Sequence, residues 1–125
     1  MAWYQEGRWQ HRLLAEQELM KSRFPQFRLV QAAGGDLRWI GTLEPVAGQE
    51  FLVSLCYPRR YPYESPKLFV EEPRIRSGAP HLYADGSLCV YKQRWDPETS
   101  TATSCIPLLA AWLARYVHWL QHQEF

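Results

Sequence analysis

The sequence predicts an α+β domain in which two helices pack on one side of a four-stranded antiparallel sheet. Amphipathic helical patterns lie near both ends of the chain, and four short apolar segments bounded by turn residues lie between them. Helices that precede and follow a run of hairpin-linked strands are typical of this class. At 125 residues the chain can bury one hydrophobic core, so we expect a single domain over residues 1–125.

The first helix is predicted from about Tyr4 to Arg23. Large side chains recur there at steps of three and four residues, which marks one helical face; they are Trp9, Leu13, Leu14, Gln17 and Met20. Pro25 ends this helix because proline cannot continue the backbone hydrogen bonding.

Four strands follow, predicted at residues 27–33, 37–43, 50–57 and 67–71, with turns at 34–36 and 45–49. Alternation predicts that one face of the second strand carries Leu37, Trp39 and Gly41, and that one face of the third strand carries Phe51, Val53, Leu55 and Tyr57. Cys56 falls on the opposite face, where we expect it to serve packing. Prolines make residues 58–66 a stiff extended loop.

The last helix is predicted after a polar run at residues 98–104, with Ser104 as its N-cap and Pro107 in its first turn. Its core face consists of Ile106, Leu109, Ala110, Leu113, Val117 and Leu120. A second stripe is formed by Trp112, Tyr116 and Trp119. We predict that this aromatic stripe docks a protein partner, with core packing as the alternative.

Composition excludes several classes of function. A net charge of +1 gives no electrostatic basis for binding nucleic acid or a membrane surface. The first residues show no signal-peptide pattern, and no apolar run is long enough to span a membrane, so a cytoplasmic location is expected. Three widely spaced cysteines form neither a disulfide framework nor a zinc motif. They are therefore either inert core residues, or at least one of them is a chemically reactive free thiol.

One segment organises the rest of the chain: residues 80–90, closed by Trp95-Asp96-Pro97. Asp85-Gly86 is a tight-turn dipeptide, because glycine adopts positive φ without steric cost. Cys89 follows three residues after this glycine, between two apolar residues. Locally, this pattern fits a nucleophile held in a fixed place or a small side chain that fills a core.

Four motifs occur in order along the middle of the chain: Tyr61-Pro62-Tyr63-Glu64-Ser65-Pro66, Pro80-His81, Asp85-Gly86-Ser87-Leu88-Cys89 and Trp95-Asp96-Pro97. Together they resemble the ubiquitin-conjugating enzymes, in which a Tyr-Pro-aromatic-x-x-Pro loop, a His-Pro-Asn stretch, a Gly-x-hydrophobic-Cys segment and a Trp-x-Pro follow one another. The resemblance spans about Trp9 to Trp119. It implies that family's fold, with an N-terminal helix, a four-stranded antiparallel meander, an active-site loop and one C-terminal helix.

The resemblance also implies a reaction. Cys89 would accept the C-terminal glycine of a carrier protein as a thioester and pass it on, without cofactor or metal. The family's His-Pro-Asn falls on Ala79-Pro80-His81, so His81 stands where the family has asparagine. This departure puts the usual conjugation to lysine in doubt.

A short chain with a His-x-Tyr-x-Asp-Gly-x-x-Cys pattern is similar to the bacterial branch of the family. That branch is often encoded beside antiphage defence genes of the CBASS type. The implied partners are a ubiquitin-like carrier or the C-terminus of a cGAS-like nucleotidyltransferase, with an adenylating activating enzyme as a further possibility.

The resemblance assigns three candidate catalytic residues. Cys89 is the nucleophile. His81 orders the loop, donates to an oxyanion or assists deprotonation, unless it is a plain loop residue. Asp96 either caps a short turn before Pro97 or positions an incoming amine. Trp95 is expected to pack beneath the cysteine loop.

Other residues give rival interpretations. Cys105, at the start of a helix, is the rival thiol, because a helix N-terminus lowers a thiol's pKa. His118 and His122 lie four residues apart and could share a metal, but with no third ligand in view we interpret them as solvated side chains. Lys92 is one of only three lysines, and we expect any self-conjugation to occur there. The alternative functions are a non-catalytic binding module of the same fold and an unrelated thiol enzyme.

Overall fold

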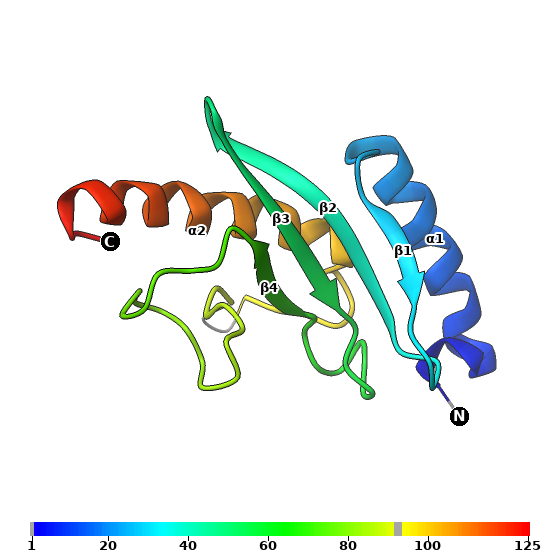
Figure 1. Cartoon of the computed structure of the whole chain (residues 1–125). Helices are drawn as coiled ribbons and strands as arrows, with labels where there is room; N and C mark the ends of the chain where they lie inside the picture. The colour runs from blue at the N-terminus through cyan, green and yellow to red at the C-terminus, as the bar shows by residue number, and fades with distance from the viewer. Residues whose placement is uncertain (1, 92–93) are drawn as a thin grey trace.

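The structure, a computed structural model, describes residues 2–91 and 94–125. In chain order its elements are the 3₁₀ helix η1 (Trp3–Gln5), α1 (Gly7–Arg23), β1 (Arg28–Gln31), β2 (Leu37–Val46), β3 (Gln49–Cys56), β4 (Lys67–Glu72) and α2 (Ala102–His122). The strands form one antiparallel sheet in the order β1-β2-β3-β4. Figure 1 shows α2 crossing the sheet and α1 lying beside β1. The predicted α+β fold is confirmed.

The inner face of the sheet carries the core. Trp39 pairs with Leu29 on one side and with Leu55 on the other, and Leu55 pairs in turn with Leu68. Trp39, Leu55 and Leu68 are all buried, as strict alternation along each strand requires. Gly41 is also buried, and a Cβ atom at this position would lie 2.6 Å from the ring of Phe27. Only glycine therefore lets Phe27 pack against β2.

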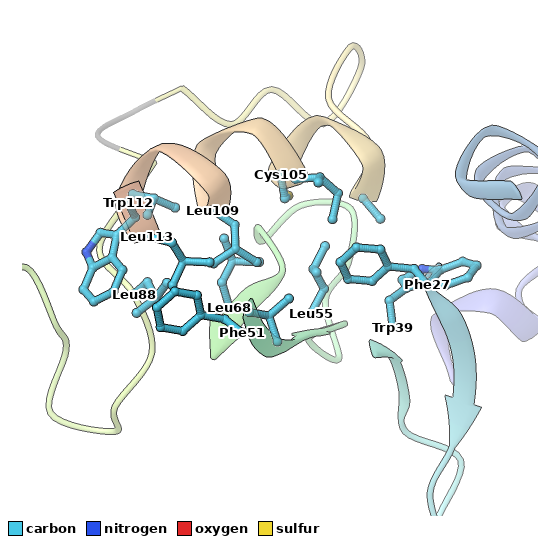
Figure 2. Packing of buried hydrophobic residues seen from close by; sticks show 14 of the residues in the cluster. Phe27, Trp39, Phe51, Leu55, Leu68, Leu88, Cys105, Leu109, Trp112 and Leu113 are labelled. Atoms are coloured by element: carbon cyan, nitrogen blue, oxygen red, sulfur yellow. The ribbon is translucent and has the colours of Figure 1, made fainter. Parts of the chain in front are cut away.

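The aromatic stripe of α2 belongs to the core, so its predicted role as a docking surface is wrong. Trp112, Tyr116 and Trp119 are only 4%, 3% and 9% exposed. Their rings stack in succession, with centroids 5.3 Å and 6.0 Å apart. Figure 2 shows Trp112 beside Leu113 and Leu88 in the cluster under the helix. Residues of both stripes of this helix are therefore buried, and the aromatic rings contribute large apolar surfaces to the core.

The start of α2 differs from the prediction by three residues. Thr101 is the N-cap, and the helix begins at Ala102. Ser104 acts one turn later, where its hydroxyl accepts a hydrogen bond from the Thr101 backbone N–H at 2.9 Å. The serine therefore completes a capping box instead of being the cap itself.

The helix α1 buries the predicted face only in part, because Met20 is buried as predicted and Leu14 is not. Leu14 is 61% exposed, whereas Glu16 and Met20 are buried. The sequence pattern treats leucine as apolar and glutamate as solvated, and here tertiary contacts reverse both assignments. The chain is extended at Glu6, which separates η1 from α1.

Glu16 is the centre of a buried polar network. Its carboxylate accepts hydrogen bonds from the hydroxyls of Tyr57 and Tyr61, from Arg12 Nε at 2.9 Å and from the Ala102 backbone N–H at 3.3 Å. These donors come from α1, from the segment after β3 and from the start of α2. The network therefore ties together three parts of the chain that are distant in sequence.

Arg12 extends this network toward the segment that precedes α2. Its guanidinium donates to the backbone carbonyls of Pro97 at 2.8 Å and Ser100 at 2.6 Å. The Trp95-Asp96-Pro97 motif and the residues after it are thus held against α1 by one side chain. Buried polar groups that are all hydrogen-bonded in this way fix the relative position of the elements they join.

Candidate active site

Residues 81–89 form a small hairpin that places His81 directly opposite Cys89. The Cys89 backbone N–H donates to the His81 carbonyl at 2.9 Å, and Leu82 forms an isolated β-bridge with Leu88. The turn is centred on Asp85-Gly86, where Gly86 has φ 89°. A residue with a Cβ rarely adopts this conformation, so glycine is required at this point. In the family pattern the position of His81 lies eight residues before the cysteine, and the pairing of His81 with Cys89 across the hairpin accounts for this spacing.

The hairpin is anchored to the sheet through its second arm and its tip. The Leu88 backbone N–H donates to the Leu68 carbonyl in β4 at 2.9 Å. At the tip, the Asp85 carboxylate accepts from Lys67 Nζ and from the Ser87 backbone N–H, both at 2.8 Å. The hydrogen bonds from Lys67 and Ser87 hold the pKa of Asp85 well below its usual range. These contacts fix the position of Cys89 relative to the core.

Cys89 is half-buried and lies between two hollows. The helix-side hollow, of about 490 Å³ and open to solvent, is lined mainly by His81, Cys89, Arg94, Trp112, Arg115 and Phe125. The strand-side hollow is wider and is lined mainly by Lys67, Tyr83, Asp85, Ser87, Cys89 and Tyr91. Cys89 therefore borders a solvent-open hollow on each of two sides.

His81 is held in an unusual backbone conformation. Its φ is 59°, in the left-handed region, where asparagine, aspartate and histidine are several-fold enriched over other non-glycine residues. Its exposed ring packs against the ring of Phe125, with centroids 4.9 Å apart. The backbone conformation explains why histidine can stand where the related enzymes have asparagine, since both tolerate it.

Tyr83 is a site residue that the sequence reasoning missed. It is 53% exposed, and its interaction with the neighbouring Cys89 thiol raises the pKa of its hydroxyl. Tyr83 and Cys89 lie on opposite arms of the hairpin. The Asp85-Gly86 dipeptide could have indicated this, because a hairpin with its turn at these residues brings the arm with Tyr83 beside the arm with Cys89.

Asp96 lies at a turn and not beside the thiol. Its carboxylate accepts from the Glu98 backbone N–H at 2.9 Å, and its carbonyl accepts from the backbone N–H groups of Thr99 and Ser100. Asp96 lines neither of the two hollows at Cys89. The structure therefore gives it the capping geometry, and its catalytic role stays a prediction.

Trp95 packs behind the cysteine segment, as predicted. Its Nε1 donates to the Pro62 carbonyl at 2.8 Å, and its ring lies 5.7 Å from the ring of Tyr61. A second aromatic contact joins it to Tyr91, at 6.1 Å between centroids. The proline-rich loop and the segment after Cys89 are thus packed together by one indole.

The other two thiols are in different environments. Cys105 is fully buried, and burial raises the pKa of its thiol to about 12. The expectation that the helix N-terminus lowers this pKa is therefore wrong, because desolvation outweighs the helix dipole here. Cys56 is half-buried near the end of β3, paired with Arg38 and Lys67, and burial also raises the pKa of its thiol.

Three further expectations concern the pair His118 and His122, membrane-spanning segments and Lys92. His118 and His122 are exposed with ring centroids 4.5 Å apart, and no group of three metal-ligating side chains occurs among residues 2–91 and 94–125. Within those same ranges, neither long helix is apolar enough to cross a bilayer. Lys92 lies outside the described residues.

Comparison with known proteins decides the family. Residues 16–125 match the family described as Type II CBASS E2 protein. The chain belongs to this family. This membership confirms the resemblance that the four motifs carry, to ubiquitin-conjugating-enzyme-like proteins of the CBASS type.

Two curated relatives are similar to this chain in sequence over part of their length. A probable ubiquitin-conjugating enzyme E2 W-A of Danio rerio is 28% identical over 50% of this chain and 42% of its own. A probable ubiquitin-conjugating enzyme E2 17 of Arabidopsis thaliana is 26% identical over 58% of this chain and 48% of its own. The chain thus spans about half the length of the curated relatives it matches.

Solved structures support the fold. A ubiquitin-conjugating enzyme from Agrocybe aegerita has a TM-score of 0.59 at 22% identity, covering 83% of this chain and 80% of that one. The yeast Vps23 UEV domain, solved in complex with a Vps27 PSDP peptide, has a TM-score of 0.58 at 16% identity, covering 81% and 78%. At these identities the likeness establishes a shared fold and nothing further.

Proposed function

We propose that this Type II CBASS E2 protein is a cysteine acyltransferase in which Cys89 carries the C-terminal acyl group of a carrier protein as a thioester. The observation that carries the proposal is the placement of Cys89, half-buried at the end of an anchored hairpin and open to a hollow on each side. A nucleophilic thiol must be accessible as well as fixed in place. Cys105, which is fully buried, does not meet the first condition.

The proposed reaction consists of two acyl transfers. In the first, the Cys89 thiolate attacks the carbonyl carbon of a carrier thioester, the old carbon–sulfur bond breaks, and the departing thiolate takes up the proton that Cys89 gave up. In the second, an acceptor such as an amine attacks the new thioester and Cys89 leaves as a thiolate, while the acceptor loses a proton. Thioester exchange is nearly isoenergetic, so the site has to orient the reactants more than to drive them.

His81 and Tyr83 are the groups positioned to assist. Tyr83 lines the strand-side hollow together with Cys89, and its hydroxyl, whose pKa the thiol raises, can orient the sulfur as a hydrogen-bond donor. The imidazole of His81 lines the helix-side hollow together with Cys89, so it can donate to the carbonyl oxygen under attack or assist proton transfer. Asp96 is proposed as a support for the segment after Trp95, through the turn that it caps.

The family points to the biological setting. We propose a role in bacterial antiphage defence, with the C-terminus of a cGAS-like nucleotidyltransferase or a ubiquitin-like carrier as the acyl donor. An adenylating enzyme that prepares the donor is part of this proposal, because a free carboxylate is not a substrate for thioester exchange. The enzyme is proposed to act in the cytoplasm, where such partners and a reduced thiol coexist.

Intact-mass measurement after incubation with an activated carrier tests this proposal. We expect a mass increase equal to the carrier's acyl group, reversed by excess thiol reagent and mapped to Cys89. A carrier that binds without any covalent adduct would instead support the non-catalytic module of the same fold.

We predict that His81→Asn slows single-turnover loading or discharge several-fold while leaving stability unchanged. Asparagine tolerates the left-handed backbone of residue 81, so this variant removes the imidazole alone. His81→Ala is the less informative change, because the left-handed conformation at φ 59° costs a residue such as alanine about 1–2 kcal/mol. A several-fold loss fits a role of the imidazole in orienting the reactants, and a loss on the order of 10²-fold would show general acid–base catalysis instead. Equal rates for His81→Asn and the wild type would reduce His81 to a loop residue.

A further inference from the structure

The helix-side hollow carries positively charged side chains and, among the described residues, no acidic side chain. Two arginines, Arg94 and Arg115, line it together with His81, and no aspartate or glutamate does. Both arginines are exposed, and neither forms an ion pair with any residue in the described parts of the chain. A guanidinium presents a planar set of donors that matches a carboxylate, so two of them beside one hollow favour an anionic ligand.

A residue that lines the same hollow, Trp112, has a buried donor without an acceptor in the described part of the chain. Trp112 is 4% exposed, and its Nε1 has no hydrogen-bond partner within residues 2–91 and 94–125. Buried polar groups are nearly always satisfied, so an orphan indole N–H calls for an explanation. The ring of Phe125, 5.4 Å from that of Trp112 between centroids, also lines this hollow.

These observations are independent and point to the same kind of ligand. The arginines supply charge, the indole supplies an unused N–H, and Leu108 and Ala111 supply an apolar wall. A short acidic side chain has an apolar stem and a carboxylate that accepts several hydrogen bonds. Because the hollow borders Cys89, its occupant lies within a few residues of the carbonyl that reacts there.

We propose that the helix-side hollow binds an aspartate or glutamate side chain in the C-terminal segment of the acyl donor, with Arg94 and Arg115 pairing its carboxylate and Trp112 Nε1 donating to it. The inference rests on the proposed function for the orientation of the donor. It makes Arg94, Arg115 and Trp112 specificity residues that distinguish acidic donor tails from neutral ones. The ring of Phe125 yields as the acidic side chain enters.

Binding of peptide amides tests this site without any chemistry. Six-residue peptides ending in glycine amide carry glutamate or glutamine second, third or fourth from the C terminus, and they are titrated into ¹⁵N-labelled protein. We expect one glutamate peptide to shift the Trp112 indole N–H resonance, assigned with Trp112→Phe, and to bind about tenfold more tightly than its glutamine counterpart. The preference should vanish in Arg94→Gln/Arg115→Gln. Arg23→Gln/Arg28→Gln, at the end of α1 and on β1, removes two charges from exposed residues outside the hollow and is the matched control that should retain the preference.

The same peptides as C-terminal thioesters separate this inference from the proposed function. Loading of Cys89 by the glutamine thioester measures acyl transfer itself, and the ratio of glutamate to glutamine rates measures the site. Equal binding of both peptides at every position, or a preference that survives in Arg94→Gln/Arg115→Gln, would overturn the site even if loading is normal. Absence of loading with a retained binding preference would overturn the transferase and leave the site standing.

Discussion

Cys89→Ala is expected to abolish covalent loading while leaving the fold intact. Cys89 is half-buried and alanine lacks only its sulfur atom, so the change is chiefly chemical. Intact-mass analysis should show no adduct, and the melting temperature should stay within a few degrees of the wild type. Normal loading of Cys89→Ala would remove the basis of the proposed function.

Two further variants sharpen this result. Cys89→Ser should either trap the carrier as an oxyester, which thiol reagents do not reverse, or fail to load. Cys105→Ser is the matched thiol control and should load at close to the wild-type rate, because Cys105 is buried beneath the start of α2. Loss of loading in folded Cys105→Ser would promote the rival thiol.

Glu16→Ala is expected to cause the largest loss of stability. The substitution leaves the guanidinium of Arg12 and the hydroxyls of Tyr57 and Tyr61 without their common acceptor. Removing one partner of a buried ion pair costs about 3–5 kcal/mol, a large part of the roughly 5–15 kcal/mol that stabilises a typical domain. Thermal unfolding should therefore shift down by on the order of 10 °C or more.

A control on the same helix isolates the cause. Glu18→Ala removes an exposed carboxylate from α1 and should change the melting temperature little. Glu16→Gln keeps the shape but loses the charge, and it should fall between the two. If Glu16→Ala melts within a few degrees of Glu18→Ala, the network does not stabilise the protein as its geometry indicates.

The network also has a defined pH dependence. Burial, and then the neighbouring Glu16 carboxylate, raise the pKa of both Tyr57 and Tyr61 above the usual value near 10. A raised pKa in the folded state means that the stabilisation is fully present below about pH 10 and is lost as the pH rises above it. Both hydroxyls are thus dependable donors to Glu16 at physiological pH.

The sequence was sufficient for most of the fold because each element has a strong local signal. Alternation along β2 and β3 correctly put Trp39 with Leu37, and Leu55 with Val53, on one face of each strand, and helical spacing correctly located α2. Motif order correctly indicated the family. These signals are local periodicities or fixed spacings, which a single sequence displays directly.

Other features depend on tertiary contacts that no local pattern contains. Glu16 is buried only because Tyr57 and Tyr61 arrive from another part of the chain. Burial of Cys105 raises its pKa, although its position at a helix start predicts a lower value. The stripe of Trp112, Tyr116 and Trp119 was ambiguous because its packing depends on how much space the sheet leaves to fill.

The paired hairpin of residues 81–89 also limits how this protein can change in length. Surface loops usually tolerate insertions, and the tip at Asp85-Gly86 can lengthen without altering the pairing of the two arms. A single residue inserted within an arm, between Leu82 and Tyr83 or between Leu88 and Cys89, would shift the register. Side chains alternate between the two faces of a hairpin, so one step turns each displaced residue to the other face. Natural length variants should therefore be confined to the tip, where His81 still faces Cys89 across the ladder.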